Sequence, residues 1–137
     1  MQKQILIDFP DELHYIEPVV IEVVKTILSD NSVEEYSISV SIVSDKIIAD
    51  LNRRFRSTLG TTDVLSFTIS DDPLEGEIYI SIDQAEAGSK ADGIPLITEL
   101  YKLIIHGALH LLNYHHDTEE EKKQNTGFTN KYLAYCV

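Results

Sequence analysis

The sequence has one cysteine, no tryptophan and no long uninterrupted apolar run. Cys136 has no partner for an intrachain disulfide, which favours a reducing compartment. No stretch approaches the roughly 20 consecutive apolar residues of a membrane-spanning helix. The first residues also lack the basic start and apolar core of a signal peptide. We therefore expect a cytoplasmic protein with no membrane partner.

Positive charge is scarce as well, with 11 Lys and Arg against 23 Asp and Glu and a formal net charge of −12. This balance argues against broad binding to a polyanion, because Lys and Arg make most phosphate contacts. The arginines nevertheless all lie in one segment, as Arg53, Arg54 and Arg56. This clustering favours a few positioned contacts with an anion. The alternative is a solvated helix end, where arginine complements the helix dipole.

The length of 137 residues and the hydrophobic content of 43% are typical of one globular domain, which we take as residues 1–137. Strict alternation predicts a half-buried strand over residues 36–43. Other segments predict strands at 4–9, 63–69 and 77–82 and helices at 15–28, 45–56, 83–89, 98–112 and 118–135. A turn is expected over residues 71–76, and a helix cap at Thr98. We expect an α+β (mixed α/β) fold, with a four-stranded mixed sheet packed with about five helices.

Histidine is concentrated in one segment, because four of the five histidines lie between His106 and His116. His106 and His110 are four residues apart and therefore share one face of a helix. Asn113 is the expected helix end, since asparagine tolerates positive φ, and His116 then turns back toward the pair. Three imidazoles with a fourth position open to water form a catalytic zinc arrangement, although other transition metals also bind imidazole. The alternative is histidines hydrogen-bonded within a core.

The same His-x3-His-x5-His spacing occurs in metzincin proteases, which have a glutamate after the first histidine as general base. This chain has Gly107 there, which has no proton-accepting side chain. The glycine argues against proteolysis. It also leaves the motif without an evident general base. Either zinc-bound hydroxide suffices, or the neighbouring His115 or Asp117 assists.

These segments resemble the YbeY family of bacterial ribosomal-RNA maturation endoribonucleases, and the resemblance covers essentially the whole chain. The family motif H-G-x-L-H-L-x-G-Y-D-H is similar to residues 106–116. The motif L-N-x-x-[YF]-R is similar to residues 51–56, and T-[DN]-V-L-S-F to residues 62–67. The chain departs from the family at Asn113 for Gly, at His115 for Asp, and at Asn125, where Met is common. The choice of His116 over His115 as third ligand therefore rests on spacing and resemblance.

The resemblance implies a metal-dependent endoribonuclease that cuts single-stranded RNA, matures the 3′ end of 16S ribosomal RNA and takes part in ribosome quality control. It implies a zincin-like site, with one zinc ion on His106, His110 and His116, at the end of a buried helix. The implied partners are ribosomal RNA, the ribosome and ribosome-associated proteins.

Arg56 is a functional position in the family, and we expect its guanidinium to stabilise the phosphate charge during cleavage. Arg53 and Arg54 are weaker candidates for contacts with flanking phosphates. Thr62, Asp63 and Ser66 are explained equally well by a turn and a strand and receive no catalytic role. The remaining alternative is a noncatalytic ribosome-assembly factor whose metal stabilises the fold.

Overall fold

The computed structural model describes residues 2–56, 62–114 and 118–136. Its elements follow in the order β1 (Lys3–Asp8), the 3-10 helix η1 (Asp11–Ile16), α1 (Glu17–Asp30), β2 (Tyr36–Val43), α2 (Asp45–Arg56), β3 (Val64–Asp71), β4 (Leu74–Ser81), α3 (Ile82–Asp92), α4 (Leu96–Leu111) and α5 (Glu119–Cys136). The predicted α+β fold, with a four-stranded mixed sheet and five α-helices, is confirmed over these ranges.

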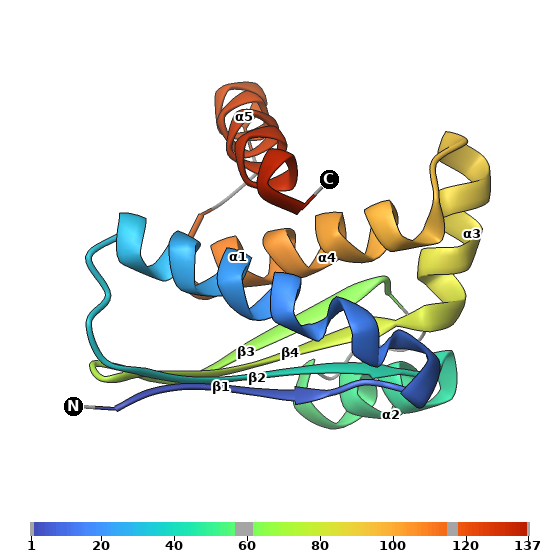
Figure 1. Ribbon diagram of the computed structural model, residues 1–137. Helices are drawn as coiled ribbons and strands as arrows, with labels where there is room; N and C mark the ends of the chain where they lie inside the picture. Colours follow the sequence, from blue (N-terminus) through green and yellow to red (C-terminus); the bar gives the residue numbers. More distant parts are fainter. Residues whose placement is uncertain (1, 57–61, 115–117, 137) are drawn as a thin grey trace.

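The sheet has the strand order β1-β2-β4-β3. β1, β2 and β4 run parallel, whereas β3 pairs antiparallel with β4 and forms one edge. Helices α1 and α4 lie over one face of the sheet, α5 packs outside them, and α2 lies on the other face (Figure 1). The helical layer is therefore two helices deep on one side of the sheet.

The core lies between the sheet and helices α1 and α4. β2 alternates as predicted, because Tyr36, Ile38, Val40 and Ile42 are buried and the residues between them are partly exposed. α4 is buried along most of its length, and its Ile104 is fully enclosed. Burying one such side chain contributes about 1.5–3 kcal/mol, so the core holds α4 firmly against the sheet. No helix within the described ranges is long and apolar enough to cross a membrane.

Two local predictions are wrong. α4 begins at Leu96 with Pro95 at its N-cap, three residues before the predicted cap at Thr98. β3 continues to Asp71 and β4 begins at Leu74, so Gly76 lies inside a strand rather than in a turn. A Cβ at Gly76 would lie only 2.8 Å from Cδ2 of Leu111. This glycine therefore makes room for the end of α4 on the sheet.

Candidate functional site

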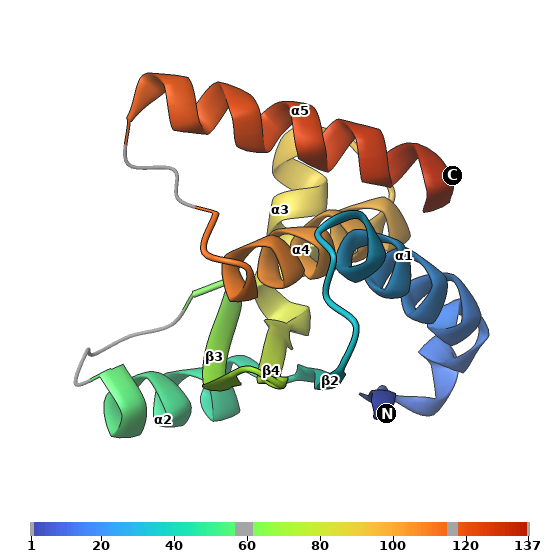
Figure 2. The same cartoon turned by 90° about the vertical axis from the view of Figure 1, so that its left-hand side faces the viewer.

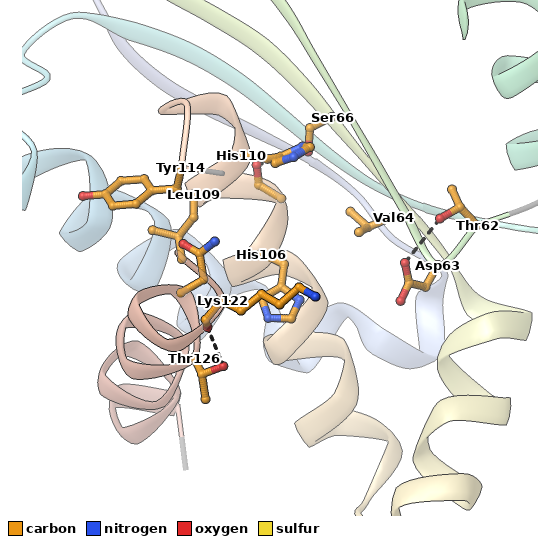
Figure 3. A pocket seen from close by; sticks show the side chains of 12 residues that line it. Thr62, Asp63, Val64, Ser66, His106, Leu109, His110, Tyr114, Lys122 and Thr126 are labelled. Atoms are coloured by element: carbon orange, nitrogen blue, oxygen red, sulfur yellow. Dashed lines mark hydrogen bonds between the residues drawn. The ribbon is translucent and has the colours of Figure 1, made fainter. Parts of the chain in front are cut away.

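A cavity of ≈ 560 Å³ lies between the start of β3, the C-terminal half of α4 and the first turns of α5. Figure 2 shows α5 crossing above α4, on the side of α4 away from the sheet. Figure 3 shows the cavity with its lining side chains. The lining comprises Thr62, Asp63, Val64, Ser66, His106, Gly107, Leu109, His110, Tyr114, Lys122, Asn125 and Thr126. Residues as distant in the sequence as Thr62 and Thr126 thus share one cavity.

His106 and His110 line this cavity together, as the sequence predicts for residues four apart on one helix. His106 is partly buried and His110 is exposed. Both belong to the last two turns of α4, whose other faces are buried in the core. A buried helix is a rigid support, so core packing fixes the backbone positions from which the two imidazoles project.

Gly107 lets α4 approach the sheet closely beside the two histidines. A Cβ at this position would lie 2.6 Å from Cγ2 of Ile78 and 3.2 Å from Oγ of Ser66. The Ser66 hydroxyl also donates a hydrogen bond to the Gly107 carbonyl at 3.1 Å. A side chain here would push α4 away from β3 and β4. The glycine that argues against a protease in the sequence therefore also has a packing role.

The chain turns at Asn113, which has φ 66° and confirms the predicted helix end. The Asn113 N–H donates to the His110 carbonyl at 3.0 Å, and the Tyr114 N–H donates to the Leu109 carbonyl at 3.1 Å. These two bonds form a Schellman motif, in which the residue with positive φ satisfies the last helical carbonyls. His115, His116 and Asp117 lie outside the described residues, so the assignment of His116 as third ligand stays a prediction.

Tyr114 fixes the exit from this turn. Its hydroxyl donates to Oδ1 of Asn31 at 2.7 Å, at the end of α1. Its ring packs edge-on against Phe128 of α5, with ring centroids 5.1 Å apart. One side chain thus joins the end of α4 to both neighbouring helices.

Helix α5 forms the outer wall of the cavity through Lys122, Asn125 and Thr126. Thr118 and Glu121 form a capping box at its start, because each side chain accepts a hydrogen bond from the other residue's backbone N–H at 3.1 Å. Sequence reasoning missed Lys122 and Thr126 and noted Asn125 only as a departure from the family. α5 has no marked apolar stripe, so its pattern gave no signal of which face lies over the cavity.

The predicted arginines lie elsewhere. Arg53 and Arg54 are on α2, which lies on the opposite side of the sheet from α4 (Figure 2). Arg53 Nη2 pairs with Asp50 Oδ1 at 2.7 Å, and Arg54 Nε lies 3.6 Å from Asp50 Oδ2. Arg56 ends α2, and its side chain is outside the described part of the structure. The structure does not bring Arg53 or Arg54 to the cavity, and their contact with RNA stays a prediction.

The model of a protein family described as "Endoribonuclease YbeY" matches residues 7–136. The chain belongs to the YbeY endoribonuclease family. It is 34% identical over 135 residues to Endoribonuclease YbeY of Geobacillus kaustophilus, covering 85% of this chain and 86% of that one. It is 35% identical over 109 residues to the Persephonella marina protein of the same name, covering 75% and 71%. The solution structure of TM1509 from Thermotoga maritima superposes with a TM-score of 0.70 at 26% identity, covering 96% of this chain and 88% of that one.

Membership of the YbeY family supports an endoribonuclease role, and thus a hydrolase that acts on RNA. The motif segments of the family lie on three elements of this fold. Residues 51–56 belong to α2, residues 64–67 to β3, and residues 106–111 to α4. β3 contacts both of the other segments. Its Val64 and Ser66 line the cavity that contains His106 and His110, which we call the histidine cavity. Its Phe67 ring packs against Phe55 of α2, with ring centroids 5.5 Å apart.

The donor set fits a metal in part. Two imidazoles line the same side of the cavity, and imidazole is the nitrogen ligand that zinc prefers. Within residues 2–56, 62–114 and 118–136, no three His, Cys, Asp or Glu side chains are grouped to hold a metal ion. The third member of the predicted YbeY set, His116, lies outside those ranges. The described part of the site therefore supplies two of the three predicted ligands.

A buried acid lies two turns before the histidines on α4. Burial raises the pKa of Glu99, the nearby Lys102 opposes this rise, and the charges of Asp92 and Asp63 add to it. The Glu99 carboxylate packs against Gly88 of α3, where an added Cβ would lie 2.6 Å from Oε2. Asp63 is the one of these charged neighbours that also lines the cavity.

Proposed function

We propose that the protein is a metal-dependent endoribonuclease specific for single-stranded RNA, acting in the cytoplasm in 3′-end maturation of 16S ribosomal RNA and in ribosome quality control. Ribosomal RNA and the ribosome, with its associated proteins, are the proposed partners. The observation that carries the proposal is the placement of His106 and His110 side by side along one wall of an open cavity in a YbeY fold. An open cavity admits a flexible single strand.

In this proposal His106, His110 and His116 hold one zinc ion or another divalent transition metal. The turn at Asn113, with its φ of 66°, supports the return of the chain toward the first two histidines. When bound, the ion supplies Lewis-acid chemistry, since it polarises a phosphoryl oxygen and lowers the pKa of water. α4 is packed into the core, so the backbone that carries two of the three proposed ligands is held in place.

The chain's other residues bind and orient the RNA. Arg56 is proposed to stabilise the negative charge that develops on the phosphate, because a guanidinium meets two oxygens with parallel hydrogen bonds. Arg53 and Arg54 are proposed to contact flanking phosphates. Gly107 offers no proton acceptor in the place where a metzincin has its glutamate, which separates this site from a zinc protease.

The test measures metal content by elemental analysis and cleavage of a single-stranded RNA in parallel. His110→Ala is expected to lose bound metal and to lower kcat/KM by about a thousandfold, because metal Lewis acidity contributes several kcal/mol. Arg56→Ala is expected to keep the metal and lose activity. His14→Ala is the matched control, because His14 lies on η1 outside the cavity. It should retain both metal and activity.

Unchanged RNA cleavage by His110→Ala, or by protein stripped of its metal, would contradict the proposed mechanism. Cleavage of peptides without cleavage of RNA would favour a metzincin-like protease. Tight RNA binding by metal-loaded protein with no cleavage would favour a noncatalytic assembly factor.

A further inference from the structure

The outer wall of the histidine cavity is formed by three polar side chains of α5. Asn125 and Thr126 follow Lys122 by three and four residues, so the three side chains share one face of the helix. All of them line the cavity. In Figure 3 the Lys122 side chain extends from α5 toward the part of the cavity where His106 lies. α5 therefore directs an ammonium group toward the side of the cavity formed by His106 and His110, which we call the histidine wall.

Lys122 is the one Lys or Arg among the described residues that line the cavity, and Asp63 on β3 is the one Asp or Glu. The ammonium lies 3.8 Å from Glu119 Oε1, and both side chains are exposed. An exposed pair of this kind is weak, so it leaves the ammonium able to bind another anion. The protein has a net charge of −12, which repels phosphate groups. The Lys122 ammonium reduces this repulsion inside the cavity.

The position of α5 over the cavity is set by contacts away from Lys122. The Tyr132 hydroxyl donates to Asp30 Oδ2 at 2.8 Å, which ties α5 to the end of α1. The ring contact between Tyr114 and Phe128 ties α5 to the end of α4. The capping box of Thr118 and Glu121 fixes the first turn. The Lys122 backbone is thus held in place before any ligand arrives.

We propose that Lys122 binds a backbone phosphate of single-stranded RNA beside the one that is cut, which makes α5 a second substrate-binding wall facing the histidines. This inference rests on the proposed ribonuclease function. An ammonium is a point charge on a flexible stem and does not match two phosphate oxygens as a guanidinium does. Lys122 therefore holds the substrate in the cavity, and its contribution is to binding more than to the cleavage step.

The chain offers a matched control in Lys123, which neighbours Lys122 on α5, is also exposed and does not line the cavity. Lys122→Ala and Lys123→Ala each remove one positive charge from the same turn of the helix, so they change the overall field of the protein alike. Neither disrupts the core, since alanine favours helix. Elemental analysis and circular dichroism of both variants verify intact metal content and helix.

The experiment measures the Kd of a short single-stranded RNA by fluorescence anisotropy over a range of salt concentrations, and kcat and KM for its cleavage, with metal-loaded protein. Lys122→Ala is expected to raise Kd and KM about tenfold, as for one charge-assisted contact, with kcat nearly unchanged. The slope of log affinity against log salt should fall by about 0.7, the value for one contact on a single strand. Lys122→Arg should restore most of the affinity, and Lys123→Ala should change Kd less than about twofold.

Equal loss of affinity in Lys122→Ala and Lys123→Ala would overturn the inference in favour of a general field effect, and unchanged affinity in Lys122→Ala would overturn it outright. In both cases the wild-type protein still cleaves RNA, so the proposed function survives. If metal-loaded wild-type protein neither binds nor cleaves RNA, the inference and the proposed function fail together.

Discussion

Helices α4 and α5 line the same cavity but are held in the fold by different forces. α4 is buried on most sides and contributes Leu100, Ile104 and Ile105 to the core. α5 buries only Thr129 and Tyr132 among its described residues and depends on a capping box and a few side-chain contacts. Core packing therefore holds the backbone of α4, whereas a few polar and aromatic contacts hold α5 over the cavity.

Gly107→Ala should have the largest effect, because it acts on the rigid helix. The new Cβ would lie 2.6 Å from Cγ2 of Ile78, and overpacking of this kind typically costs about 1–3 kcal/mol. Urea unfolding should show this loss of stability, and cleavage should fall because the histidines move with α4.

Gly127→Ala on α5 is the control, since nothing lies within 4 Å of its Cβ. It should stabilise the protein by about 0.5–1 kcal/mol. Equal responses at the two glycines would contradict the contrast between the helices.

Thr118→Ala tests the outer helix and should have a smaller effect on stability. Loss of an N-cap hydroxyl costs about 1 kcal/mol. Because the first turn of α5 carries Lys122 toward the cavity, KM for RNA should rise while metal content stays unchanged. Thr118→Ser keeps the hydroxyl and should behave as wild type in thermal unfolding and in kinetics. Loss of metal in Thr118→Ala would show that α5 also controls the histidine wall.

Glu99→Gln should give the smallest change, visible mainly in its pH dependence. Burial raises the folded-state pKa of Glu99, so its contribution to stability is complete below the usual pKa of a glutamate and declines as the pH rises through the folded-state value. The melting temperature of Glu99→Gln, relative to that of wild type, should therefore rise as the pH increases from 4 toward neutrality. Loss of the attraction between Glu99 and Lys102 makes this rise smaller.

Glu120→Gln, at an exposed position of α5, controls for the loss of one negative charge. A difference between Glu99→Gln and wild type that does not vary with pH would contradict this account of the buried acid.

The parts of the site that lie on α4 could be predicted from the sequence because local rules determine them. Helical spacing brings His106 and His110 together, and the φ preference of asparagine marks the end of the helix at Asn113. The strand at 36–43 follows from alternation in the same way. Each of these features depends on residues within a few positions of one another.

The other wall could not be predicted because it depends on distant contacts. The orientation of α5 follows from the hydrogen bond between Tyr132 and Asp30, which are 102 positions apart, and no pattern within α5 indicates it. The sequence pattern places Gly76 in a turn for a related reason. Its role in the structure is to accommodate Leu111, a contact that becomes apparent only when α4 lies on the sheet.

The central claim, that the cavity between α4 and α5 holds a metal-dependent ribonuclease site, is tested most directly by removing and restoring the metal. Purified protein is treated with a chelator, dialysed, and assayed on single-stranded RNA before and after addition of one equivalent of zinc. We predict that cleavage is lost with the metal and returns with zinc in wild-type protein, but not in His110→Ala. Cleavage that persists at the wild-type rate in metal-free protein would contradict the claim.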